Sequence, residues 1–329
     1  MRIIYYGTPS LSVAPLRRLV RDGRAPLLVV TRRDRPRGRG LETGASPVRM
    51  EAEALGLPVA TPVRAGAPEE LARLRALEPD LVVLVAYGEI LSREILELPR
   101  LGALNVHFSL LPRHRGASPV QAAILAGDRE TGITTMWMTE RLDEGPTFLQ
   151  RATPIEENET AGALGDRLAA LGAEGLAATL DRIEHGEFPR VGQDASRATY
   201  APKLAPDAGR LSLDVSQADL VRRVRAFTPE PGAYLNLTSG RLLVVEMAVG
   251  DLQGQACGGT SAPDRATTAL AGKVLCIDRT RGLEIASKGG SIWLRRVRPS
   301  GRRVMTGREY ANGARLKAGD RLPIIAGEN

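Results

Sequence analysis

Short apolar runs alternate with helix-like segments through the first half of this chain of 329 residues. Runs that are apolar nearly throughout are typical of strands buried on both faces of a parallel sheet, and the segments between them serve as crossover helices. The pattern therefore predicts an α/β fold with a doubly wound, mostly parallel sheet. The expected strands are Ile3–Tyr6, Leu27–Val30, Leu81–Val85, Ala103–Val106 and Thr134–Met138, and the expected helices are Leu11–Val20, Pro47–Leu55, Glu69–Leu77, Ser118–Ala126 and Thr160–His185. The last helix is either continuous or interrupted near Gly172–Gly175.

The pattern of alternating apolar runs and helix-like segments ends near residue 186. The stretch Gly186–Asp207 is polar, contains three prolines and has no helical or strand period, so we interpret it as a linker. One helix-like segment, Gln217–Phe227, then precedes short β-like runs separated by Gly, Pro and Asp, which predicts a small barrel or sandwich. We expect a flexible loop at Gly250–Thr268. The expected strands are Tyr234–Leu237, Leu242–Met247, Lys273–Ile277, Leu283–Ala286 and Ile292–Val297, and the expected domains are 1–186, a linker 187–207, and 208–329.

Bulk composition fits a globular protein. Hydrophobic residues make up 43% and charged residues 25% of the sequence. No apolar run approaches the roughly 18 residues that a membrane span needs. Met1–Gly7 leads directly into an expected strand and does not resemble a secretory signal. We therefore expect a cytoplasmic protein with no membrane association, and nothing in the sequence implies a protein partner.

The net charge of +7 is unevenly distributed. Residues 1–203 contain 26 Lys and Arg against 26 Asp and Glu, whereas residues 204–329 contain 19 against 12. All of the basic excess therefore belongs to the second half. A solvated basic face and a polyanionic partner both remain open as explanations.

Two polar residues end one of the expected strands. Asn105 and His107 are two positions apart, so in a strand their side chains project from the same face. Ligands of open α/β sheets bind beyond the carboxyl ends of parallel strands, which is where this pair would lie. Taken locally, the motif favours a structural interpretation, a strand-end histidine bonded to backbone, because Asn-X-His alone is a weak signal. Further along, Asp143 lies in a glycine-containing turn and is a candidate partner for His107, although such residues often only form turns.

A longer sequence pattern is similar to that of a known protein family. The string Asn105–Pro112 is followed, 31 residues after Pro112, by Asp143 in Leu-Asp-Glu-Gly, and together they resemble the signature of the folate-dependent formyltransferases. Further segments resemble the branch of that family that acts on a charged tRNA. These are Gly7–Pro9, Asp34–Gly40, Ser46–Val48, Val85–Gly88, Arg113–Pro119, Thr199–Leu204, Arg225–Ala233 and Gly301–Met305.

The resemblance implies a fold and a chemistry. It implies a Rossmann-like catalytic domain with a C-terminal barrel of the OB type, and 10-formyltetrahydrofolate as the formyl donor. Asn105, His107 and Asp143 are implied to be catalytic. No His, Cys or Asp cluster has ligand spacing, so we expect no metal. The residues implied to contact folate are Val85, Ala86, Tyr87, Gly88, Ile90, Leu91, Ser109, Leu110, Leu111, Pro112 and Leu142.

The resemblance also implies an acceptor, methionyl initiator tRNA. The basic residues expected to contact it form one cluster in an N-terminal loop and one near the C-terminus: Arg35, Arg37 and Arg39, and Arg295, Arg298, Arg302 and Arg303. Phe108 departs from the family pattern, because Gly is common at this position beside the catalytic His107. Arg141 likewise stands before Leu142 where Gly is common.

Three other functions would each explain part of the sequence. A formyltransferase acting on a nucleotide-linked amino sugar would keep the same catalytic residues but would not need a basic second half. A nucleic-acid-binding protein with a decayed catalytic domain would not need the complete set Asn105, His107 and Asp143. A dinucleotide-dependent oxidoreductase is rejected, because Gly7-Thr8-Pro9 lacks the Gly-X-Gly-X-X-Gly spacing that brings the backbone close to a pyrophosphate.

Overall fold

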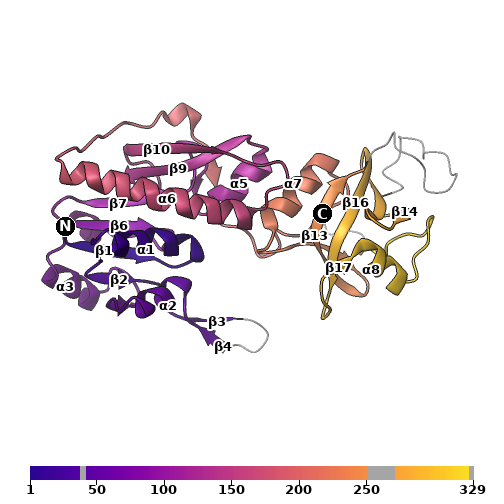
Figure 1. The fold of residues 1–329 in the computed structure, drawn as a ribbon, viewed down its shortest axis with the longest axis horizontal. Helices are drawn as coiled ribbons and strands as arrows, with labels where there is room; N and C mark the ends of the chain where they lie inside the picture. Colours follow the sequence, from indigo (N-terminus) through magenta and orange to yellow (C-terminus); the bar gives the residue numbers. More distant parts are fainter. Residues whose placement is uncertain (38–41, 251–270, 326–329) are drawn as a thin grey trace. The chain divides into compact units, whose positions relative to one another are not determined.

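The computed structural model describes residues 1–37, 42–250 and 271–325. Contacts between Cα atoms divide the chain into two compact units. The first contains Met1–Ala123, Asp128–Glu156 and Ala163–Lys203, and the second contains Ile124–Gly127, Glu157–Gly162 and Leu204–Asn329. Each unit has its own sheet (Figure 1).

The first unit is built on a seven-stranded sheet with the order β10-β9-β7-β6-β1-β2-β5. Five neighbouring strands run parallel, and two antiparallel strands extend the sheet from β7. The mostly parallel sheet expected from the sequence is therefore confirmed. Its strands are β1 (Ile3–Gly7), β2 (Leu28–Val30), β5 (Val59–Ala60), β6 (Leu81–Val85), β7 (Ala103–His107), β9 (Glu130–Trp137) and β10 (Thr147–Pro154).

Helices cover both faces of this sheet, which explains why its central strands are apolar throughout. Alternate residues such as Ile4 and Val82 join Leu74 and Ile95 of two helices in one buried cluster. On the other face, the Tyr5 hydroxyl donates to the Ser12 carbonyl at 2.5 Å. The helices are η1 (Ser10–Ser12), α1 (Val13–Arg21), α2 (Pro47–Ala54), α3 (Pro68–Ala76), α4 (Arg93–Glu97), α5 (Pro119–Ala126) and α6 (Ala161–Glu184).

Helix α6 is continuous over 24 residues, so the interruption considered near Gly172–Gly175 does not occur. These glycines allow close packing instead. A Cβ atom on Gly175 would lie 2.5 Å from Ile133 Cδ1, and one on Gly172 would lie 3.2 Å from Phe108 Cε1. Phe108 is only 4% exposed. Its large ring is therefore accommodated under α6, where Gly172 leaves room for it.

Several elements were not expected from the sequence. Strand β10, helix α4 and strand β5 were missed, as were two small pairings. One is the antiparallel hairpin of β3 (Arg35–Arg37) and β4 (Glu42–Gly44). The other joins β8 (Arg115–Gly116) in parallel to β11 (Tyr200–Ala201).

The stretch interpreted as a linker runs along the first unit as far as residue 203. Val191 exchanges backbone hydrogen bonds with Thr147, and the Trp137 indole donates to the Pro189 carbonyl at 3.0 Å. A short 3-10 turn, η2 (Ala195–Arg197), then leads into β11. These contacts hold the polar, proline-containing stretch against the end of β9 and the start of β10, on either side of the loop that carries Asp143.

The second unit is an antiparallel sheet with the order β12-β13-β16-β15-β14, to which β17 adds beside β16. Ile324 bridges Leu237 at the end of β12, and Arg321 bridges Lys273 beside β14, so the C-terminal segment joins both edges as expected of a barrel. The expected loop at Gly250–Thr268 lies outside the described residues from 251 onward. The elements are α7 (Gln217–Phe227), β12 (Ala233–Leu237), β13 (Gly240–Val249), β14 (Val274–Asp278), β15 (Gly282–Ser287), β16 (Gly290–Pro299), β17 (Met305–Thr306) and α8 (Gly307–Gly313).

Over the described ranges, no helix combines the length and apolar character needed to cross a membrane.

Candidate active site

Strand β7 places Asn105 and His107 at the carboxyl end of the parallel part of the sheet. Asn105 lies beside Leu84 of β6, and His107 lies beside Thr134 of β9. Both side chains are buried, with 6% and 5% of their surface exposed. Because β6 and β7 are parallel, the loops that follow them leave the sheet at the same edge.

Asp143 joins this pair from the loop between β9 and β10. Its Oδ1 accepts a hydrogen bond from Asn105 Nδ2 at 3.2 Å, and its Oδ2 accepts one from the backbone N–H of Gly116 at 2.8 Å. Oδ2 also lies 3.7 Å from His107 Nδ1. The structure thus brings the three residues expected to be catalytic into one buried cluster.

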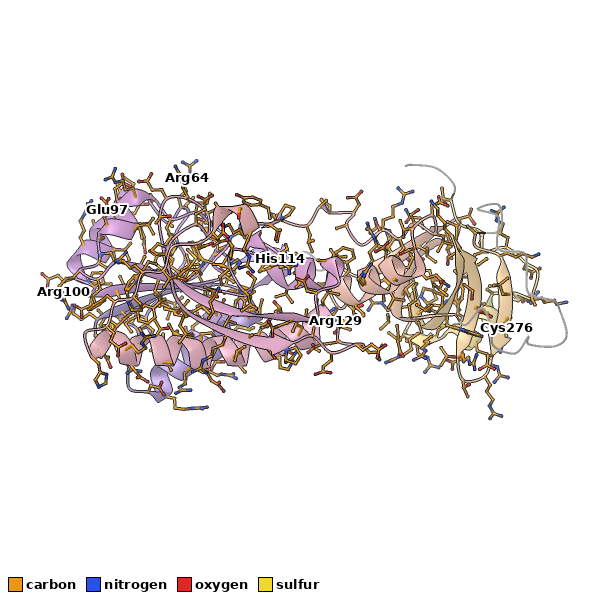
Figure 2. All side chains as sticks on the ribbon, turned by 90° about the horizontal axis from the view of Figure 1, so that it is seen from above. Arg64, Glu97, Arg100, His114, Arg129 and Cys276 are labelled. Carbon is orange, nitrogen blue, oxygen red and sulfur yellow. The ribbon has the colours of Figure 1, made fainter. Side chains whose placement is uncertain are left out.

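The backbone around His114 determines which nitrogen of His107 carries a proton. His107 Nε2 lies 2.9 Å from the His114 carbonyl oxygen, which can only accept, so Nε2 is the donor. His114 itself is buried in the first unit (Figure 2), and its Nε2 lies 2.7 Å from Asp128 Oδ2. The remaining nitrogen of His107, Nδ1, therefore faces the carboxylate of Asp143.

Strained backbone is concentrated here. Five described residues other than glycine have positive φ, and three of them are Ala86 (46°), His114 (56°) and Asp143 (53°). L-residues adopt this region reluctantly, and such strain often accumulates at functional sites. The cluster around Asn105 is therefore maintained by its surroundings at a cost in local backbone energy.

The loop after β6 contains residues expected to contact folate. It is anchored by two hydroxyl groups: Thr8 Oγ1 donates to the Tyr87 carbonyl at 2.8 Å, and Ser12 Oγ donates to the Val85 carbonyl at 2.6 Å. Burial raises the pKa of the Tyr87 phenol, so this group stays protonated. Val85, Tyr87 and Leu91 are buried, Ala86 is half-buried, and Gly88 and Ile90 are exposed.

The second folate-directed segment follows β7. The Thr134 hydroxyl donates to the Ser109 carbonyl at 2.7 Å and accepts from the Leu111 N–H at 3.1 Å. Gln150 Nε2 donates to the Leu111 carbonyl at 2.7 Å. Ser109 and Leu111 are buried, and Leu110 and Pro112 are half-buried. Leu142, in the Asp143 loop, is 59% exposed.

Models of the formyl transferase family match both halves of the chain. A model described as "Formyl transferase" matches residues 1–180, and one described as "Formyl transferase, C-terminal domain" matches residues 203–315. The chain belongs to the formyl transferase family. A relative named methionyl-tRNA formyltransferase from Halorhodospira halophila is 44% identical over 97% of this chain and 98% of its own length. Another of that name, from Symbiobacterium thermophilum, is 41% identical over 98% of this chain and 95% of its own length. The family resemblance that the sequence motifs indicated is thus confirmed.

Solved structures share the fold of this formyl transferase at low identity. HypX from Aquifex aeolicus in complex with tetrahydrofolic acid has a TM-score of 0.62 at 17% identity, covering 100% of this chain and 50% of its own. An N-formyltransferase from Helicobacter canadensis, in complex with folinic acid and dTDP-3-aminofucose, has a TM-score of 0.61 at 15% identity, covering 89% of this chain and 98% of its own. The present chain therefore spans half the length of HypX.

The arginines expected to contact tRNA are divided between the units of this formyl transferase. Arg295 and Arg298 lie on β16, and Arg302 and Arg303 follow it; all four are exposed. Arg35 and Arg37 begin and end β3, and Arg39 lies outside the described residues.

Sequence reasoning missed two side chains at the site. Arg115 is 4% exposed and Gln193 is half-buried. Arg115 donates a hydrogen bond to Gln193, and Gln193 donates one to the Asp143 carbonyl. Arg115 was part of a recognised motif, but Gln193 lies in the proline-containing stretch and carries no sequence signal of its own. In the part of the chain that the structure describes, no group of three or more potential metal ligands occurs.

Proposed function

We propose that this formyl transferase moves the formyl group of 10-formyltetrahydrofolate to the α-amino group of methionyl initiator tRNA. The observation that carries the proposal is the cluster of Asn105, His107 and Asp143 in a chain whose relatives match it almost end to end. The proposed place of action is the cytoplasm, where a charged initiator tRNA is used.

Asn105 is proposed to stabilise the oxyanion. When the amine attacks the formyl carbon, the formyl oxygen becomes negatively charged in a tetrahedral intermediate, and preorganised donors stabilise that charge. One N–H of the Asn105 amide is directed to Asp143 Oδ1. The amide has a second N–H, which is assigned to the developing oxyanion.

Asp143 and His107 are proposed to accept the proton that the attacking amine loses. A carboxylate and an unprotonated Nδ1 are both acceptors, so the 3.7 Å separation of Asp143 Oδ2 and His107 Nδ1 is favourable when a proton lies between them. The attacking amine must lose a proton, which Asp143 can receive directly or through a water molecule. When the intermediate collapses, the bond between the formyl carbon and N10 of the folate breaks, and N10 takes up a proton as tetrahydrofolate leaves. The Gly116 N–H supports the carboxylate while His107 supplies the second proton-binding group.

The folate is proposed to contact apolar side chains that the fold leaves exposed. Ile90, in the loop after β6, is 79% exposed, and Leu142, next to Asp143 in the chain, is 59% exposed. Arg93 lies 3.7 Å from Glu140, which brings the segment after Ile90 close to the segment before Leu142. Exposed apolar side chains near convergent polar groups are typical of ligand sites.

The basic face of β16 is the proposed tRNA contact in the second unit. The register with β13 shifts twice, which leaves Val245 of β13 and Arg295 of β16 without register partners. This bulge lets Arg295 and Arg296 both face outward, where strict alternation would bury one of them. A row of exposed guanidinium groups can contact phosphates without reading bases.

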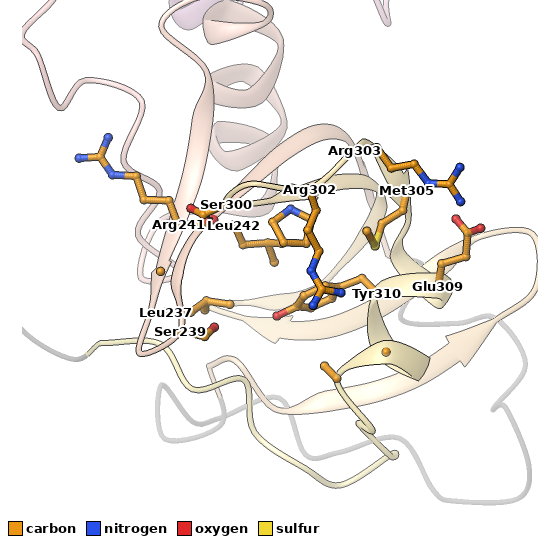
Figure 3. A pocket seen from close by; sticks show the side chains of 14 residues that line it. Leu237, Ser239, Arg241, Leu242, Ser300, Arg302, Arg303, Met305, Glu309 and Tyr310 are labelled. Atoms are coloured by element: carbon orange, nitrogen blue, oxygen red, sulfur yellow. Dashed lines mark hydrogen bonds between the residues drawn. The ribbon is translucent and has the colours of Figure 1, made fainter. Parts of the chain in front are cut away.

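A pocket of about 510 Å³ in the second unit continues this basic surface (Figure 3). Arg241, Arg302 and Arg303 line it together with the side chain of Tyr310. Figure 3 shows Arg302 extending toward Tyr310 and Arg303 lying toward Glu309. Glu309 Oε2 accepts from the backbone N–H and hydroxyl of Thr306, and the Arg303 charge acts on the same carboxyl group. Three arginines line the pocket with this one carboxylate, so its excess positive charge suits an added anion, such as a tRNA phosphate.

An amino-sugar acceptor has weaker support. Its structural counterpart, the Helicobacter canadensis enzyme, is only 15% identical, a level that speaks for the fold alone. The full-length relatives are 41% to 44% identical and carry the methionyl-tRNA name.

An acceptor panel tests the proposal. Purified protein and 10-formyltetrahydrofolate would be incubated with methionyl initiator tRNA, methionyl elongator tRNA and a nucleotide-linked amino sugar, and formylated product measured by mass spectrometry. We expect the initiator tRNA to be consumed fastest. Preferential consumption of the amino sugar would overturn the proposed acceptor.

A further inference from the structure

The turn that carries Asp143 is held from its backbone side by one glutamine. Gln193 Nε2 donates to the Asp143 carbonyl at 2.8 Å and to the Gly145 carbonyl at 2.7 Å. The two acceptors flank Glu144, so both amide hydrogens of Gln193 fix the same turn. Asp143 has a φ of 53° within it, a conformation that needs support from its surroundings.

The oxygen of the same amide is also fully engaged. Gln193 Oε1 accepts from Arg115 Nε at 3.1 Å and from Arg115 NH2 at 2.9 Å. Carbonyl oxygens only accept and a guanidinium only donates, so the network admits one orientation of the amide. Every hydrogen-bonding position of Gln193 is therefore used to connect Arg115 with the Asp143 turn.

Arg115 is itself fixed by its neighbours. It is 4% exposed, and its NH1 lies 3.4 Å from Glu144 Oε1, within the turn that Gln193 holds. The next residue, Gly116, donates its N–H to Asp143 Oδ2 at 2.8 Å. A Cβ atom at Gly116 would lie 2.6 Å from the Ala201 carbonyl oxygen, so a side chain would disturb the β8–β11 pairing there. Arg115–Gly116 thus holds both the backbone and the carboxylate of the Asp143 turn.

Gln193 is anchored on both sides along the chain. Two residues earlier, Val191 exchanges backbone hydrogen bonds with Thr147 at 2.8 and 3.0 Å. After it, β11 pairs with β8, which contains Arg115. The segment that carries Gln193 is therefore fixed against β10, which follows the Asp143 turn, and against β8, which contains Arg115.

We infer that Gln193 and Arg115 are positioning residues that hold the Asp143 carboxylate in its reactive place; the inference rests on the proposed function. Neither needs to touch substrate. Gln193 acts through the two carbonyl groups of the turn, and Arg115 acts through Gln193 and Glu144. Losing the Gln193 donors would let Asp143 move relative to Asn105 and His107, and displacements near 1 Å can cost on the order of 100-fold in rate.

Three variants separate positioning from simple stability. Gln193→Ala removes donors and acceptor together. Gln193→Glu keeps an acceptor for Arg115 but puts a carboxylate against two carbonyl oxygens, so the turn loses its donors while the contact with Arg115 is kept. Gln121→Ala is the matched control, because Gln121 is a half-buried glutamine on α5 for which the described structure has no side-chain hydrogen bond.

The experiment measures kcat, KM for each substrate, and the thermal melt of all variants. We expect Gln193→Ala and Gln193→Glu to lower kcat by about 10- to 100-fold, with KM changed less than about twofold. In an Asp143→Ala background, Gln193→Ala should have no further effect on kcat, because Gln193 acts only through that carboxylate.

The outcomes are distinguishable. A wild type that formylates no acceptor refutes the proposed function itself. An active wild type with normal kcat in both folded Gln193 variants, or a full additional loss in the Asp143→Ala background, overturns the positioning role. A loss of kcat in Gln121→Ala as large as that in Gln193→Ala would also overturn it.

Discussion

Asn105 and Asp143 are 38 positions apart in the chain and are joined by a hydrogen bond of 3.2 Å. The amide fixes one oxygen of the carboxylate, and the Gly116 N–H fixes the other at 2.8 Å. Asp143 is therefore held in one orientation, with Oδ2 directed toward His107.

Removing either partner of this hydrogen bond should abolish most activity. We expect Asn105→Ala and Asp143→Ala each to lower kcat by at least about 100-fold, the usual loss for an oxyanion donor or a proton carrier. Thermal melts should show that both variants fold. Asp166→Ala, at an exposed position on α6, is the control and should keep wild-type kcat. Near-normal turnover in a folded Asp143→Ala enzyme would refute the proton-transfer role.

Phe108 should contribute strongly to stability. Because its buried ring packs beneath Gly172, Phe108→Ala should lower the free energy of unfolding by about 3 to 5 kcal/mol, measured by urea denaturation. In that background, Gly172→Ala should recover up to about 1 kcal/mol, through helix propensity and partial filling of the space.

Gly165→Ala is the matched control for this pair. Its added Cβ would lie 3.6 Å from Leu11 Cδ2, an ordinary contact that does not involve Phe108. Its effect should therefore be the same with and without the Phe108 ring. An equal effect of Gly172→Ala in both backgrounds would show that the two residues are not coupled.

Glu70 should make stability depend on pH. Burial raises the pKa of this carboxyl group, and its Oε1 has no hydrogen-bond partner. Because the folded-state pKa is the higher one, the favourable contribution is fully present below the unfolded-state pKa of about 4.3 and is lost as pH rises through the folded-state pKa. Glu70→Gln should therefore stabilise the protein at pH 7 by about 1 kcal/mol and have little effect near pH 4. Exposed Glu69→Gln is the control; a stability difference for Glu70→Gln that does not change with pH would contradict this account.

Substitutions in the two arginine clusters should have different effects on tRNA binding and on formylation. Arg302→Ala combined with Arg303→Ala should weaken tRNA binding and reduce the slope of log affinity against log salt by about one to two. Arg295→Ala should have a smaller effect, because Arg295 NH1 already lies 3.4 Å from Glu246 Oε1. Arg39→Ala should lower the formylation rate more than it lowers tRNA affinity. An unchanged affinity and salt slope in the Arg302 and Arg303 double variant would exclude this cluster from the interface.

Local sequence patterns predicted the sheet and the place of the site for a physical reason. Fully buried parallel strands need apolar residues throughout, and the ends of such strands meet at one edge, so Asn105 and His107 could be placed there. The turn around Asp143 made it only a candidate partner for His107, and the family resemblance assigned it to the catalytic set. The edge strand β10 was harder to predict. After the buried Phe148, it alternates between half-buried and exposed positions and includes Gln150, Arg151 and Thr153, so it lacks an apolar run.

Contacts that depend on the path of the chain could not be predicted. Gln193 meets the Asp143 carbonyl across 50 positions, and nothing in its proline-containing surroundings indicates that contact. The place of Phe108 depends on which glycine of α6 lies above it, which requires the helix position over the sheet.

Single-turnover formylation of methionyl initiator tRNA by wild type and His107→Ala tests the central claim most directly. The wild type should produce formylmethionyl-tRNA when mixed with 10-formyltetrahydrofolate. His107→Ala, shown by its melt to be folded, should do so at least about 100-fold more slowly, because the Asp143 carboxylate loses the ring beside it. A folded His107→Ala enzyme that formylates the tRNA at a rate close to wild type would contradict the account.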